Sequence, residues 1–169
     1  MTRLILLRHA KSDWSDEGQD DHARPLNARG RAAAGRIGRY LREHDIAPDL
    51  VVCSTAQRTR DTVAIALSEA GLAPRIVYDP ALYLSAPEHM LKAALAHADG
   101  AECVMIVGHN PGTEGLAAKL ARAGDPALIA KLRAKYPTGG LAVFTCADGF
   151  AGLPGNARLD AYVVPRDLS

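Results

Sequence analysis

The chain has 169 residues, 48% of them hydrophobic, and its 20 Lys and Arg residues nearly balance its 19 Asp and Glu residues. This length predicts one compact domain over residues 1–169, and the net charge of +1 argues against a dedicated nucleic-acid binder. The opening apolar run ends at Arg8 and His9, which is too early for a signal-peptide core. No run reaches the ~18 apolar residues that a membrane-spanning helix needs, so we expect no membrane association.

The cysteine pattern indicates a reducing compartment. Cys53, Cys103 and Cys146 are an odd number of cysteines, widely spaced, and each lies in an apolar run. This pattern favours buried free thiols over disulfides or a metal site, so a cytoplasmic location is expected.

Short apolar runs alternate with helical patterns along the chain. Strands are predicted at residues 4–7, 50–53, 76–78, 104–107, 141–145 and 159–164. Helices are predicted at residues 28–44, 57–70, 87–98 and 113–123. Asn27 suits an N-cap and Gly71 suits a C-cap. The alternation predicts an α/β three-layer sandwich, with a mostly parallel central sheet, helices on both faces, and an antiparallel edge formed by the last two strands.

Charged and polar side chains follow three of the predicted strands at the point where each strand ends. Arg8 and His9 follow the first strand, residues 54–58 follow the second, and residues 108–110 follow the fourth. Because ligands of parallel sheets bind beyond the carboxyl ends of the strands, two arginines and two histidines are expected at one site. Arginine grips phosphate oxygens with a planar fork, and neutral histidine is an available nucleophile near pH 7. The pattern therefore predicts phosphoryl transfer.

The same three segments match a family pattern in order and at family-like separations. Residues 7–10 read Leu-Arg-His-Ala, where the family pattern has Arg-His-Gly. Residues 54–62 have a Ser at the strand end, an Arg four residues later and a Thr four beyond that. Residues 107–110 place a His directly after an apolar strand. The chain thus resembles the histidine phosphatase (phosphoglycerate mutase-like) superfamily over nearly its whole length.

Size and the Arg-His-Ala-Lys-Ser opening make the chain similar to the small SixA-like phosphohistidine phosphatases. Larger members of the superfamily carry an inserted subdomain with a carboxylate that protonates the leaving oxygen. Here the expected position of that acid is about Leu84. An alkoxide leaving group needs a general acid, whereas the imidazole of phosphohistidine leaves more easily. The resemblance therefore implies cleavage of a P–N bond.

The resemblance also implies roles for individual residues. His9 corresponds to the nucleophile that becomes phosphorylated, Arg8 and Arg58 to phosphate clamps, and His109 to a second, cationic histidine that donates to a phosphoryl oxygen. Ser15 stands near the position where relatives carry a phosphate-binding Asn. The further candidate phosphate-binding residues are Ser15 and Asn110.

Several residues have competing interpretations. Ser54 lacks a surrounding G-x-S-x-G motif, so a hydrogen-bonding role at the strand end is favoured over a nucleophilic one. Trp14 is expected either at the pocket mouth or beneath its loop, and Thr138 is expected near the site or in a turn. The candidate general acids, all otherwise solvated, are Asp13, Asp16, Glu17, Asp20, Asp21 and Glu88.

The leading hypothesis is a phosphohistidine phosphatase that acts through a phospho-His9 intermediate. The expected partner is a phosphorylated protein, such as a histidine phosphotransfer domain, or else a small phosphorylated molecule. A phosphatase for small phosphomonoesters and a mutase are alternative enzymes, and a non-catalytic phosphate-binding or phosphohistidine-binding module is an alternative of another class. No cofactor or metal is expected, because no His-carboxylate spacing typical of metal ligands is present.

Overall fold

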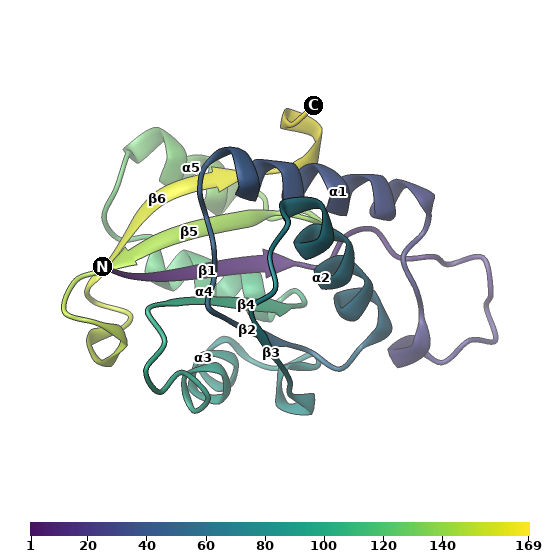
Figure 1. Ribbon diagram of the computed structural model, residues 1–169, viewed down its shortest axis with the longest axis horizontal. Helices are drawn as coiled ribbons and strands as arrows, with labels where there is room; N and C mark the ends of the chain where they lie inside the picture. Colours follow the sequence, from purple (N-terminus) through teal and green to yellow (C-terminus); the bar gives the residue numbers. More distant parts are fainter.

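A six-stranded sheet forms the centre of the molecule in a computed structural model that describes residues 1–169 (Figure 1). Its strands lie in the order β3-β2-β4-β1-β5-β6. Their bounds are β1 Thr2–Arg8, β2 Leu50–Cys53, β3 Arg75–Tyr78, β4 Cys103–Gly108, β5 Leu141–Cys146 and β6 Ala157–Val163. The first four pair in parallel, and β5 pairs antiparallel with both β1 and β6. The predicted mostly parallel sheet with an antiparallel edge is confirmed.

Five α-helices cover the two faces of this sheet. They are α1 Ala28–Glu43, α2 Gln57–Ala70, α3 Pro87–Leu95, α4 Gly112–Leu120 and α5 Pro126–Ala134. Helices α1 and α2 pack together on the near face in Figure 1, and α3, α4 and α5 cover the far face. The result is the three-layer arrangement that the alternation of strands and helices predicts.

Strand β1 shows why the sheet is buried on both sides. Its residues Leu4 and Leu6 belong to the larger core cluster, beneath α3 and α4, whereas Ile5 and Leu7 belong to the cluster beneath α1 and α2. All four are fully buried. Full burial of such side chains contributes about 1.5–3 kcal/mol each, so a continuous apolar run is the sequence signature of this central strand.

Local signals explain where the helices near the site begin and end. The Asn27 side chain accepts a hydrogen bond from the Gly30 backbone N–H at 2.8 Å, as expected of an N-cap. Gly71 ends α2 in the left-handed conformation at φ 71°. Helices α3 and α4 each end three residues earlier than predicted. Helix α5 was not predicted, although Asp125 caps it and Pro126 occupies its first turn.

The carboxyl ends of the parallel strands lie at one edge of the sheet. In register, Arg8 at the end of β1 stands beside Gly108 of β4, and Cys53 of β2 stands beside Val107. The chain segments that leave these three strands therefore begin side by side. None of the helices has the length and apolar character required to cross a lipid bilayer.

Candidate active site

A pocket of about 440 Å³ opens at this edge of the sheet. Its lining residues are Arg8, His9, Lys11, Ser12, Trp14, Asp21, Arg58, Leu84 and Thr138. His109 lies beside it, with its ring centroid 5.3 Å from that of His9. The four residues predicted for phosphoryl transfer are thus brought together. Both histidines and Arg58 are buried, at 7% exposure or less.

The backbone fixes the tautomer of His9. Its Nδ1 lies 2.7 Å from the carbonyl oxygen of Ala10, which can only accept, so Nδ1 donates and Nε2 keeps its lone pair. Burial, with a smaller effect of Arg58 and Arg8, lowers the pKa of His9 to about 4, although the hydrogen bond to Ala10 acts in the opposite direction. At neutral pH the ring is uncharged, with Nε2 available as a nucleophile.

Ser54, which follows the neighbouring strand β2, makes a hydrogen bond with His109. The Nε2 of His109 lies 2.8 Å from Ser54 Oγ, while its Nδ1 is buried without a hydrogen-bond partner. Burial lowers the pKa of His109 to about 3, and the nearby His9 and Arg58 act in the same direction. The cationic charge expected of His109 stays a prediction, and the burial of the ring opposes it. Ser54 has the hydrogen-bonding role predicted for it.

Arg58 is the second residue of α2, and Asp21 holds its guanidinium in place. Nη1 donates to the Asp21 carbonyl at 2.8 Å, and Nη2 donates to Asp21 Oδ2 at 3.1 Å. The same carboxylate accepts a 2.5 Å hydrogen bond from the Tyr83 hydroxyl. That hydrogen bond is the main reason why the pKa of Asp21 is lowered, with Arg58 adding to the effect. Asp21 is therefore the ionised partner of Arg58 and is unsuited to donate a proton.

Arg8, the last residue of β1, is held by the segment after α5. Its Nη1 donates to the carbonyl of Tyr136 at 3.0 Å, and the Tyr136 hydroxyl donates back to the Leu6 carbonyl at 2.7 Å. Arg8 Nε is buried without a partner. Because Arg8 lines the pocket, the remaining N–H groups of its guanidinium are available to an anion there.

Thr62 links the segment that carries His9 to helix α2, which carries Arg58. Its Oγ1 donates to the Arg58 carbonyl at 2.7 Å and accepts from the Ala10 N–H at 3.0 Å. One buried hydroxyl therefore fixes the spacing between β1 and α2. These two hydrogen bonds give a physical reason for the threonine at the end of the family pattern in residues 54–62.

Comparison with known proteins agrees with this geometry. A model of the histidine phosphatase superfamily (branch 1) matches residues 4–83. A structure from Agrobacterium tumefaciens, described as a candidate phosphohistidine phosphatase SixA, is 33% identical, with a TM-score of 0.82 over 97% of this chain and 98% of that chain. This chain belongs to the histidine phosphatase superfamily, in its SixA-like branch. An uncharacterised protein of Mycobacterium tuberculosis is 39% identical over 95% of this chain and 100% of its own length.

A more distant structure supports the fold of this SixA-like protein. The protein histidine phosphatase SixA complexed with tungstate is 18% identical, with a TM-score of 0.75, and the superposition covers 98% of this chain and 99% of that chain. At this identity the likeness concerns the fold alone. It places the six-stranded sheet and its helices in the phosphoglycerate mutase-like arrangement.

Two further candidate residues of this histidine phosphatase do not line the pocket. Ser15 is exposed, and its N–H donates to Asp13 Oδ1 at 2.8 Å. The Asn110 amide donates to the Tyr136 carbonyl at 3.0 Å and accepts from the Glu114 N–H at 3.2 Å, so both of its ends are occupied. Lys11 and Ser12, which precede Ser15 in the chain, line the pocket instead.

Of the candidate general acids, Asp21 alone lines the pocket. Glu88 pairs with Lys119 on the far face of the sheet, and the lining excludes Asp13, Asp16, Glu17 and Asp20. Leu84 occupies the pocket wall where larger relatives are expected to carry the acid, and it is 54% exposed. No group of three or more His, Cys, Asp or Glu side chains is arranged to hold a metal ion.

The supporting tyrosines were not found from the sequence. Tyr83 and Tyr136 lie outside every motif, and their contacts with Asp21 and Arg8 join residues 62 and 128 positions apart. No local pattern signals such contacts. Thr138 and Trp14 do line the pocket, and the Arg24 guanidinium lies 3.8 Å over the Trp14 ring.

Proposed function

We propose that this protein is a phosphohistidine phosphatase that works through a phospho-His9 intermediate. The observation that carries the proposal is the neutral His9 ring, with Nδ1 tied to Ala10 and Nε2 free, between Arg8, Arg58 and His109. Nucleophile and oxyanion donors are thus preorganised before substrate arrives, which is the main requirement of phosphoryl transfer.

The proposed reaction has two displacements at phosphorus. The lone pair of His9 Nε2 attacks phosphorus, and the bond from phosphorus to the substrate nitrogen breaks. The substrate leaves as neutral imidazole, because its other nitrogen has taken a proton from solvent. Water then attacks phospho-His9, releasing inorganic phosphate and restoring His9. Covalent capture divides one difficult hydrolysis into two easier steps.

Arginine and histidine donors have separate tasks in this scheme. Arg8 and Arg58, which both line the pocket, offer their guanidinium N–H groups to non-bridging oxygens. When Ser54 donates to His109 Nε2, the proton of His109 resides on Nδ1, which has no protein partner and can donate to the same phosphoryl group. A dianionic phosphoryl group opposes the low pKa of His109 and favours its charged form.

The leaving group is inferred from what the pocket wall contains. Leu84 has no proton to give, and Asp21 is ionised and paired with Arg58 and Tyr83. An alkoxide would have to leave from a sugar phosphate without assistance, whereas imidazole leaves readily. The absence of a protonated carboxyl in the lining favours P–N over P–O cleavage.

The first experiment tests the covalent intermediate. The protein is mixed with phosphoramidate, quenched in base, and examined by mass spectrometry for an acid-labile phosphoryl group on His9. The variant His9→Asn should accumulate none and should lose turnover, since amide nitrogen is not nucleophilic. Normal turnover by this variant would end the proposal.

The second experiment tests the substrate class. Initial rates are compared on a phosphohistidine peptide, a phosphoserine peptide of the same sequence, and a sugar phosphate. We expect kcat/KM to be highest for phosphohistidine, because only its leaving group dispenses with a general acid. A preference for the sugar phosphate would favour a phosphomonoesterase or mutase, and binding without turnover would favour a non-catalytic reader.

A further inference from the structure

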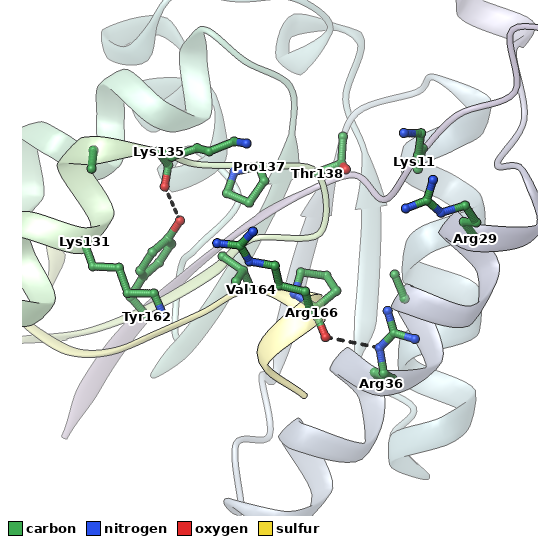
Figure 2. A pocket seen from close by; sticks show the side chains of 13 residues that line it. Lys11, Arg29, Arg36, Lys131, Lys135, Pro137, Thr138, Tyr162, Val164 and Arg166 are labelled. Atoms are coloured by element: carbon green, nitrogen blue, oxygen red, sulfur yellow. Dashed lines mark hydrogen bonds between the residues drawn. The ribbon is translucent and has the colours of Figure 1, made fainter. Parts of the chain in front are cut away.

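A second cavity, of about 500 Å³, lies next to the catalytic pocket and shares Lys11 and Thr138 with it (Figure 2). It lies between α1, α5 and the chain after β6. Its charged lining consists entirely of cations, and we call these six residues the basic groove: Lys11, Arg29, Arg36, Lys131, Lys135 and Arg166. In a chain whose net charge is only +1, this is a strong local concentration of positive charge.

Carboxylates of the protein leave most of this charge unneutralised. No acidic residue lines the cavity, and Lys131 alone of the six has an ion pair, with Asp167 at 2.6 Å. Arg36 Nε donates to the Pro165 carbonyl at 3.2 Å, as drawn in Figure 2. Six cations facing one space repel one another, so the arrangement costs stability that a bound anionic partner would recover.

The catalytic pocket also has two exposed apolar residues that do not line the basic groove. Trp14 is 67% exposed and Leu84 is 54% exposed, and both line that pocket. They are two of the four large hydrophobic residues that the protein exposes. Exposed aromatic and aliphatic side chains beside a polar site are typical of surfaces that contact another protein.

These observations favour a macromolecular ligand over a small one. Five of the six groove cations are exposed on long side chains, and only Arg36 is half-buried. A small-molecule site would instead enclose its ligand and fix it with a few buried polar groups. Exposed Lys and Arg side chains suit the carboxylates of an extended, acidic protein surface.

We infer that the basic groove docks acidic side chains that flank the phosphohistidine of a protein substrate. This inference rests on the proposed function, since the groove is useful to catalysis only when the scissile phosphoryl group enters beside His9. Asp and Glu residues on the substrate would lie on the groove while Trp14 and Leu84 contact its apolar surface. The groove thereby selects substrates by the charge around the phosphohistidine.

The test compares two phosphohistidine peptides of about 15 residues, which can extend to about 50 Å and so reach beyond the pocket. One carries glutamate on both sides of the phosphohistidine, and the other carries glutamine at the same positions. Phosphoramidate, which cannot reach the groove, reports the chemistry and the folding of each variant. The groove variant combines R29Q, K135Q and R166Q, and the matched control combines K92Q, R122Q and R158Q, exposed residues outside both cavities.

We expect the groove variant to lose about tenfold in kcat/KM on the glutamate peptide, chiefly through KM, because exposed ion pairs are weak singly and add over three positions. Its rates on the glutamine peptide and on phosphoramidate should equal those of the wild type. The control variant should equal the wild type on all three substrates. Added salt should weaken the preference for glutamate. Equal kcat/KM for both peptides on wild type, or an unchanged groove variant, overturns the inference. If the wild-type protein hydrolysed none of the three substrates, the proposed function would instead be refuted.

Discussion

The two buried histidines predict how the stability of this protein depends on pH. Burial lowers the pKa of His9 from 6.5 to about 4 and that of His109 from 6.5 to about 3. In the unfolded chain both rings titrate near 6.5. Below that pH the unfolded state binds protons that the folded state does not. The folded state, in which both rings are neutral, therefore has its full stability above pH 6.5. This stability is lost progressively as pH falls toward the folded pKa values.

The magnitude follows from proton linkage. Each proton taken up on unfolding changes the free energy of unfolding by about 1.36 kcal/mol per pH unit. With both rings largely protonated in the unfolded chain and neutral in the folded one, acidification from pH 6 to pH 5 should cost roughly 2–3 kcal/mol. This is a substantial part of the 5–15 kcal/mol that holds a typical domain together.

Urea unfolding followed by far-ultraviolet circular dichroism measures this directly, between pH 7 and 5 in buffers without phosphate, which would bind the site. The matched control is the double variant His9→Asn, His109→Asn, which retains polar side chains but cannot titrate. Its free energy of unfolding should fall less steeply than that of wild type, and the difference isolates the two rings. Parallel curves for the two proteins would refute the reasoning, because the histidines would then have unshifted pKa values.

Three further substitutions probe the contacts around the site. Ser54→Ala removes the partner of His109 Nε2, so we expect a loss of about 1–3 kcal/mol in urea unfolding and a reduced kcat; unchanged kcat would exclude a role in orienting the ring. Asp21→Asn removes the negative charge 3.1 Å from Arg58 and should tighten the binding of inorganic phosphate severalfold by calorimetry. Weaker binding would show instead that the carboxylate is needed to position the guanidinium. Gly30→Ala would place a Cβ 2.1 Å from a backbone oxygen of the loop after β1, and should cost about 1–3 kcal/mol in thermal unfolding, with activity reduced too; an unchanged melting temperature would contradict that clash.

The secondary structure was predictable where burial and capping leave a local pattern. Strand β1 is apolar without alternation because both of its faces are covered, and α2 ends at a glycine in the left-handed conformation. Helix α5 escaped prediction because Leu132 is its only buried residue, so its apolar periodicity is weak. Its start was nevertheless marked by Asp125, which caps the helix, and by Pro126 in the first turn.

The sequence by itself determined that two arginines and two histidines reach the site. Arg8 ends β1, His9 and His109 directly follow β1 and β4, and Arg58 lies in the first turn of the helix after β2. The carboxyl ends of these parallel strands share one edge of the sheet. That placement depends only on the order of strands and helices, which local periodicity reports. Family resemblance gave the same four residues.

Only the tertiary structure decided the state of those residues. The lowered pKa values of His9 and His109 depend on burial, and the pairing of Arg58 with Asp21 depends on a partner from another segment. The basic groove likewise joins cations from α1, α5 and the chain after β6, which are distant in sequence. Charge state and pairing are set by distances through space, and a sequence pattern reports neighbours along the chain.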